Sequence, residues 1–99
     1  MKATIKRTNN FNTTVFNELN FVSHPMGNGM IQCIVEFKNG YGASIVQGAF
    51  TYGEGEGLYE IAVFGKDGKI SYNTPITSEV LGNLNEEDVE KILIDIKNL

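Results

Sequence analysis

"MIQCIVEFKNGYGASIV", residues 30–46, has a β-hairpin pattern from which the rest of the expected architecture follows. Asn39-Gly40 is the turn signal, because Asn-Gly supplies the positive φ angles that tight hairpin turns require. Apolar side chains recur at every second position on both sides of this turn, as in strands with one buried face: Ile31, Cys33, Val35 and Phe37, then Tyr41, Ala43 and Ile45. The pattern predicts a hairpin over residues 30–47.

A second stretch, "LYEIAVFGKDGKISY" at residues 58–72, repeats this logic around Asp67-Gly68. Its flanks are rich in β-branched and aromatic residues, which predicts a hairpin over residues 58–73. Apolar side chains occur on both faces of its first half, which predicts a central strand covered on both sides: Tyr59, Ile61 and Val63 on one face, and Leu58, Ala62 and Phe64 on the other.

The end of the chain changes from a period of two to a helical period. Asn85 is a good N-cap, and three acidic residues follow it where the helix dipole favours negative charge. The segment predicts a helix over residues 86–98 with one apolar face: Val89, Ile92, Leu93, Ile96 and Leu99. Weaker strand patterns occur at residues 2–7 and 13–22. We expect a single α+β domain over residues 1–99, with an antiparallel sheet of about five or six strands packed against the helix.

Composition and charge exclude several classes of function. The net charge is −4, and the acidic excess lies within residues 79–99, which carry six acidic and two basic side chains. Without a basic stripe, direct binding of nucleic acid is not expected. No stretch approaches the roughly 20 apolar residues of a membrane span. Cys33 is the single cysteine, so an internal disulfide is excluded and a cytoplasmic location is the simplest expectation.

Residues for catalysis or metal binding are scarce. His24 is the only histidine, and it lies in a polar loop beside Pro25. Cys33 lies on the apolar face of its predicted strand, where a thiol behaves as a small apolar side chain. A structural zinc site takes four Cys or His ligands, and the chain contains two such residues. Glu54 and Glu60 form a conceivable acid/base pair, but two carboxylates alone are too common to support it. We expect neither an enzyme nor a bound cofactor or metal.

The glycine-rich run "FTYGEGEGLYE", residues 50–60, allows several interpretations. Glu54 and Glu56 disfavour a phosphate-binding loop, and the pattern of a calcium loop is absent. A plain connection at residues 48–57 and a protein-contact tip carrying Tyr52 and Tyr59 both remain open. The candidate partner-binding residues are the tyrosines and acidic side chains of this run, the first hairpin and the helix start: Tyr41, Tyr52, Glu54, Glu56, Tyr59, Glu86 and Glu87.

The run "NGYGASIVQGAFTYGEGEGLYE" at residues 39–60, followed by "TPIT" at residues 74–77, resembles a family of small uncharacterised proteins encoded by phages and prophages. The resemblance implies a phage-infected bacterial cytoplasm, where small acidic proteins often block host factors such as CRISPR effectors and other defence enzymes. It provides no catalytic residue.

Together these observations favour a non-enzymatic binding protein that inhibits or redirects a host bacterial protein, as an anti-defence, anti-CRISPR-type inhibitor does. The acidic helix would steer it toward a basic surface, such as that of a defence nuclease. The alternative is a binding or sponge protein for a small nucleotide-like ligand. A homodimer through an edge strand or through the helix is a further expectation.

Overall fold

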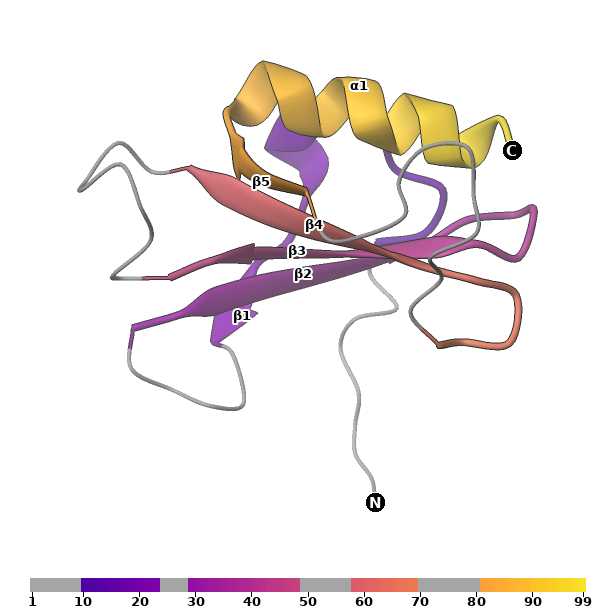
Figure 1. Ribbon diagram of the computed structural model, residues 1–99, viewed down its shortest axis with the longest axis horizontal. Helices are drawn as coiled ribbons and strands as arrows, with labels where there is room; N and C mark the ends of the chain where they lie inside the picture. Colours follow the sequence, from indigo (N-terminus) through magenta and orange to yellow (C-terminus); the bar gives the residue numbers. More distant parts are fainter. Residues whose placement is uncertain (1–9, 24–28, 49–57, 70–80) are drawn as a thin grey trace.

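The structure, a computed structural model, describes residues 10–23, 29–48, 58–69 and 81–99. Within this part of the chain, five strands form one antiparallel sheet in the order β1-β2-β3-β4-β5, and one helix lies across a face of it (Figure 1). The predicted α+β class is therefore confirmed. The elements in chain order are the 3₁₀ helix η2 (Phe16–Glu18), β1 (Val22–Ser23), β2 (Ile31–Glu36), β3 (Gly42–Gln47), β4 (Tyr59–Phe64), β5 (Leu81–Leu84) and α1 (Glu86–Lys97).

The turn of the first hairpin connects β2 to β3 as predicted, but its geometry differs from the expected one. The Gly40 N–H donates to the Phe37 carbonyl at 3.0 Å, and the Phe37 N–H donates to the Tyr41 carbonyl at 2.8 Å. Gly40 has a φ of +95°, whereas Asn39 does not have a positive φ. The expectation of two positive φ angles is wrong, because this is a type I turn closed by one left-handed glycine.

The second predicted turn, at Asp67-Gly68, has the same construction. The Gly68 N–H donates to the Gly65 carbonyl at 2.9 Å, and the Gly65 N–H donates to the Lys69 carbonyl at 2.8 Å. Gly68 has a φ of +81°, matching Gly40. The returning half of the predicted 58–73 hairpin, from residue 70 on, lies outside the described residues, as do the predicted strand at residues 2–7 and most of the glycine-rich run.

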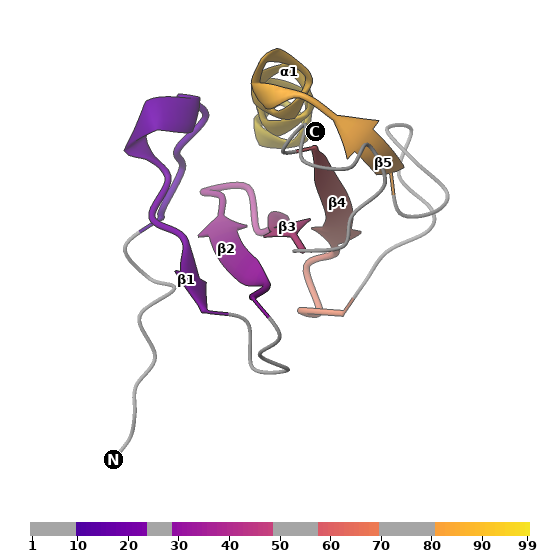
Figure 2. The same ribbon diagram turned by 90° about the vertical axis from the view of Figure 1, so that its left-hand side faces the viewer.

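The core lies between the sheet and α1. Every second residue of β2, β3 and β4 points to the helix, and α1 contributes the apolar face that its period predicts. Figure 2 looks along α1 and shows the sheet below it, with β5 rising beside the helix. The core side chains that are at most 3% exposed are Cys33, Val35, Phe37, Ala43, Ile45, Ile61, Val63, Val89, Leu93 and Ile96.

The middle of the sheet is β3, so the prediction that β4 is the central strand is wrong. Four consecutive residues of β3, Gly42 to Ile45, are buried, as expected for a strand covered on both faces. In β4, Tyr59, Ile61 and Val63 are buried while Glu60 is exposed. The strand is interior, between β3 and β5, yet it keeps a buried and a more open face.

Strand β5 was not expected from the sequence, because its residues Leu81–Leu84 include a glycine and an asparagine, which are poor strand formers. It pairs with the first half of β4, with Leu84 opposite Tyr59 and Leu81 opposite Ile61. The three residue intervals from Leu81 to Leu84 therefore pair with only two intervals from Tyr59 to Ile61, and this mismatch is a β-bulge. Asn83 absorbs the extra residue with a φ of +58°, in the left-handed region that asparagine tolerates.

The strand predicted over residues 13–22 is wrong in its first part, because residues Phe16–Glu18, before β1, form a 3₁₀ turn. The Phe16 ring lies edge-on to the Tyr59 ring at 5.2 Å, and the Phe16 N–H donates to the Glu90 carboxylate at 2.6 Å. Phe21 completes the cluster, with its ring 5.7 Å from that of Tyr59. These contacts join the segment to residues of β4 and α1 that lie far along the sequence, so the local sequence pattern does not predict them.

Helix α1 begins at the predicted residue, and a reciprocal capping box closes its N-terminus. The Asn85 side chain accepts a hydrogen bond from the Asp88 N–H at 2.8 Å, and the Asp88 carboxylate accepts one from the Asn85 N–H at 3.1 Å. The helix ends at Lys97, one residue before the predicted end. Leu99, expected on the apolar face, lies beyond it and is 37% exposed.

Asn39 connects the first turn to the end of this helix. Its Nδ2 donates to the carbonyls of Ile96 at 2.8 Å and Lys97 at 3.1 Å, in the last turn of the helix, where carbonyls lack the regular intrahelical partner four residues on. Its Oδ1 accepts from the Tyr41 N–H at 3.0 Å. Asp67 has the equivalent place in the second turn, where its carboxylate accepts from the Lys69 N–H at 3.0 Å.

This difference between the two turns gives a testable prediction. Asn39→Asp should lower the free energy of unfolding by about 1–2 kcal/mol, because it removes two hydrogen bonds and places a carboxylate against two carbonyl oxygens. Asp67→Asn is the matched control and should change stability by less than about 0.5 kcal/mol. Urea denaturation at neutral pH measures both. Equal losses in the two variants would contradict the contact between Asn39 and the helix end.

Candidate functional site

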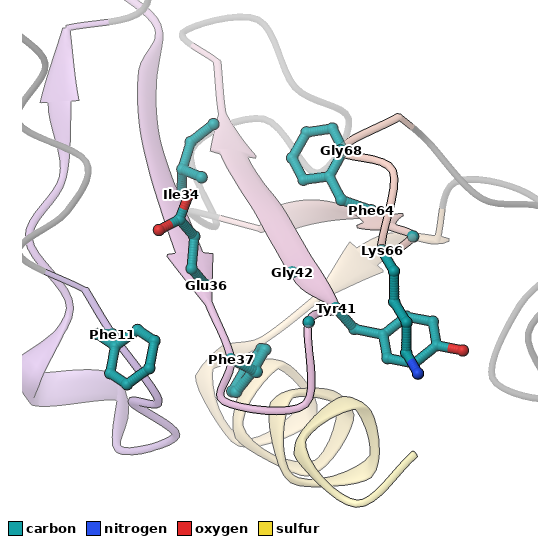
Figure 3. Close-up of a pocket in the computed structure, with 11 residues that line it drawn as sticks. Phe11, Ile34, Glu36, Phe37, Tyr41, Gly42, Phe64, Lys66 and Gly68 are labelled. Atoms are coloured by element: carbon teal, nitrogen blue, oxygen red, sulfur yellow. The ribbon is translucent and has the colours of Figure 1, made fainter.

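A hollow of about 550 Å³ lies at the end of the sheet where the two turns lie, and Ile34, Gly42 and Phe64 line it from the face opposite α1. We call it the open-face hollow. Figure 3 shows Gly42 between β2 on one side and Phe64 on the other, so that the floor carries no side chain. The side chains that line the hollow around Gly42 are Phe11, Ile34, Glu36, Tyr41, Phe64 and Lys66.

The local sequence explains why the floor is bare. A Cβ added to Gly42 would lie 2.9 Å from the Val35 carbonyl oxygen and 3.7 Å from the Phe64 side chain. The first distance is shorter than real Cβ contacts allow, so the packing of β3 on β2 requires glycine here. Gly42 pairs with Phe64 in the β3–β4 register, and the Phe64 ring therefore stands directly beside the vacant position.

Aromatic and aliphatic side chains form the walls of the open-face hollow. Ile34 and Phe64 are half-buried, while the Phe11 side chain is 57% exposed. Phe11 reaches the hollow because the N-terminal segment joins the free edge of β2: the Asn12 N–H donates to the Glu36 carbonyl at 2.6 Å, and the Glu36 N–H donates to the Asn10 carbonyl at 3.0 Å. Phe11 thus adds an exposed aromatic ring to the edge of the hollow.

Two charged side chains line the hollow from opposite sides of Gly42. Lys66 belongs to the second turn, and its ammonium lies 5.5 Å from the centre of the Tyr41 ring, within the range of a cation–π interaction. The stem of Lys66 lies against Gly40, where an added Cβ would come within 3.1 Å of its Cγ. Glu36 stands across β3 from Lys66 (Figure 3), and its side chain is exposed. The hollow thus has an acidic wall and a basic wall.

The structure separates the predicted partner-binding residues instead of gathering them. Tyr41 is half-buried at the open-face hollow. Glu86 and Glu87 are exposed on the first turn of α1. Asn39 ties the turn next to the hollow to the last turn of this helix, so the acidic pair lies at the other end, about 16 Å away along the helix axis at 1.5 Å per residue.

Tyr59 occupies the core and not a contact surface. It is 9% exposed and packs against Phe16 and Phe21, so its ring offers no area to a partner. Burial raises the pKa of its hydroxyl, Glu86 raises that pKa further, and a hydrogen bond with Gln47 opposes the shift. Tyr52, Glu54 and Glu56, the remaining predicted contact residues, lie outside the described residues.

The sequence contains two signals of the hollow, one on β4 and one on β3. The apolar side chains on the second face of β4, including Phe64, led us to expect a strand covered on both sides. A glycine inside an alternating strand, as at Gly42, often marks a place where a ligand or another backbone comes close. Phe11 and Lys66 had no such signal, because tertiary contacts alone bring them to the same site.

Cys33 is a buried thiol, as its place on the apolar face predicts. Its side chain is 1% exposed, and burial raises the pKa of the thiol to about 11, opposed by a hydrogen bond with the Asn20 backbone. A thiol with that pKa is protonated near neutral pH and is a poor nucleophile. His24 lies outside the described residues. Among residues that the structure describes, no three His, Cys, Asp or Glu side chains form a group able to hold a metal ion.

Comparisons with protein families, with curated proteins and with solved structures found no match. Within the described ranges, no helix combines the length and the apolar character needed to cross a membrane. Function is therefore inferred from the two surfaces described above: the open-face hollow and the acidic start of α1.

Proposed function

We propose that this chain is a non-enzymatic binding protein that captures a partner through the open-face hollow. The observation that supports this most directly is the arrangement of the hollow itself: a bare glycine floor, aromatic walls and the exposed ring of Phe11. An apolar side chain of a partner can enter such a hollow and lose its contact with water, which is how contact anchors contribute most of their binding energy.

The partner that we propose is a host bacterial protein with a basic surface. The resemblance to phage-encoded proteins suggests the bacterial host, and an anti-defence role follows from that setting alone. The charge of the chain supports the second part, because Glu86 and Glu87 are exposed on a helix that carries most of the acidic excess. Negative charge on one face steers a basic partner and raises its association rate, especially at low salt.

The test is an affinity capture from bacterial lysate with the tagged full chain and three variants. Phe11→Ser removes the exposed ring at the hollow, and Glu86→Gln with Glu87→Gln removes the acidic pair. Tyr52→Ala tests the glycine-rich run on sequence grounds. We expect one stoichiometric host protein that is depleted at least about tenfold by Phe11→Ser, as loss of a contact anchor predicts. The acidic double variant should lose capture mainly at low salt.

Circular dichroism of each variant serves as the folding control for this experiment. The Phe11 side chain is 57% exposed, so its replacement should leave the spectrum unchanged. Retention of the partner by a folded Phe11→Ser variant, together with its loss in Tyr52→Ala, would move the contact site from the hollow to the glycine-rich run. A lane without any stoichiometric protein would contradict capture of a host protein.

Binding of a small ligand is the second candidate function, and the size of the hollow favours it. Ligand sites in proteins usually enclose about 300–1,000 Å³, are mostly apolar and carry a few well-placed polar groups. The open-face hollow has a volume of about 550 Å³, although it is open to solvent and its lining is as polar as it is apolar; one carboxylate and one ammonium are among its lining groups. A ligand of the right chemistry should raise the melting temperature of the chain by mass action.

A further inference from the structure

We propose that the open-face hollow binds a nucleoside monophosphate, or another flat ring that carries hydrogen-bond donors and is joined to an anionic group. The proposal deepens the second candidate function, since it names the class of ligand for the same hollow. It depends on three features that line the same hollow: a lysine beside Tyr41 at one edge, a glycine floor beside the Phe64 ring, and a carboxylate on the opposite wall.

Lys66 is held in position to receive the anionic group. Its stem lies against the first turn at Gly40, and its ammonium lies over the Tyr41 ring, which is its contact among the described residues. The ring accepts the cation through its face and uses none of the three N–H donors in a hydrogen bond to oxygen. A lysine ammonium binds phosphate as a point charge, so these donors suit a phosphate at the mouth of the hollow.

The floor and walls suit a flat ring. Gly42 leaves a vacant position directly beside the Phe64 ring, and Ile34 faces it from the neighbouring side of the floor (Figure 3). A base stacks on an aromatic side chain in a way that tolerates differences between bases, because every base has a flat π-face. Phe11, which is 57% exposed at the rim, provides a second ring.

Glu36 determines which way round the ligand lies in the hollow. Its carboxylate stands across Gly42 from Lys66, so an anion close to Glu36 is disfavoured while a donor there is favoured (Figure 3). A carboxylate accepts hydrogen bonds from the amino and imino groups on the edges of bases. A base edge at Glu36 and a phosphate at Lys66 satisfy both walls at once.

The charge of the chain favours a single nucleotide over a strand. The net charge is −4, which repels a polyanion and offers few cations for the release of counterions. Within the hollow, the described charged groups are one lysine and one glutamate. One phosphate is therefore matched by one ammonium, whereas further phosphates of a strand would meet no described cation in this site.

The experiment is a titration of the ¹⁵N-labelled full chain with AMP, CMP, GMP and UMP, followed by NMR and by calorimetry. Adenosine and inorganic phosphate are the two partial ligands. We expect amide shifts to concentrate at residues 34–42 and 64–68, and AMP to bind at least about tenfold more tightly than either partial ligand. Lys66→Gln should weaken AMP binding about tenfold while binding of adenosine stays unchanged.

Lys69→Gln is the matched control, because Lys69 is an exposed lysine of the same turn that does not line the hollow. It should leave AMP affinity within about twofold of the original. The proposal is overturned by the absence of shifts at about 1 mM nucleotide, by shifts centred away from the hollow, by equal losses in the two lysine variants, or by tighter binding of an oligonucleotide than of AMP. Capture of a host protein is measured separately, so either result stands without the other.

Discussion

Leu93→Ala should lower the free energy of unfolding by about 3 kcal/mol, within the 2–5 kcal/mol range seen when a buried leucine is truncated. Leu93 is 0% exposed and lies on the face of α1 that covers β3 and β4. The change removes apolar surface from the core and leaves a cavity that the rigid sheet closes only in part. Urea denaturation followed by circular dichroism measures the loss as a shift of the midpoint at constant slope.

Ile94→Ala is the matched control on the same helix. Ile94 is the neighbouring residue but points away from the sheet, with 45% of its surface exposed. Its truncation should cost less than about 1 kcal/mol, since little of its apolar surface leaves water on folding. Similar losses for the two variants would mean that α1 packs through a different face, and the core described here would be wrong.

Asn10→Ala should lower the free energy of unfolding by about 2 kcal/mol, the second largest effect that we expect. Asn10 is a buried polar residue, 1% exposed, and its side chain satisfies both backbone groups of Asn20: Oδ1 accepts from the N–H at 2.9 Å, and Nδ2 donates to the carbonyl at 3.4 Å. The alanine variant removes both of these hydrogen bonds from the Asn20 backbone. The same denaturation experiment measures the loss.

The control for this variant is Asn20→Ala. Asn20 takes part in the contact only through its backbone, and the residue is exposed, so its side chain should be removable at a cost below about 0.5 kcal/mol. The contact between Asn10 and Asn20 also joins the two ends of the segment that places Phe11 at the hollow and Phe16 at the core. A full-sized loss in Asn20→Ala, or none in Asn10→Ala, would show that this segment is held in another way.

Local signals were sufficient for the parts of the fold whose contacts are close in sequence. Alternation around Asn39-Gly40 predicted the first hairpin, and a capping residue followed by an apolar stripe predicted α1 from its first residue. In both cases, each element forms most of its hydrogen bonds with residues fewer than 20 positions away. The class of the fold follows from these two elements, because a sheet and an amphipathic helix must bury their apolar faces against each other.

The elements that were missed depend on contacts between distant parts of the chain. Leu81–Leu84 has a composition unfavourable for a strand, and it becomes one by pairing with β4 through a bulge at Asn83. The 3₁₀ turn Phe16–Glu18 is stabilised by a hydrogen bond from the Phe16 N–H to the Glu90 carboxylate, 74 residues away. The open-face hollow combines Phe11, Gly42 and Lys66 from three separate segments. Of these three residues, only the glycine could have been singled out from the sequence.

The matching construction of the two turns has a consequence for how binding preferences could change during evolution. A type I turn closed by glycine fixes its last two residues and accepts almost any residue at its second position, which is Lys38 in one turn and Lys66 in the other. The residue that sets the charge at the hollow therefore occupies one of the most replaceable positions of the fold. Replacing this lysine with a neutral or acidic residue would therefore change the charge at the hollow while the backbone of the turn stays the same.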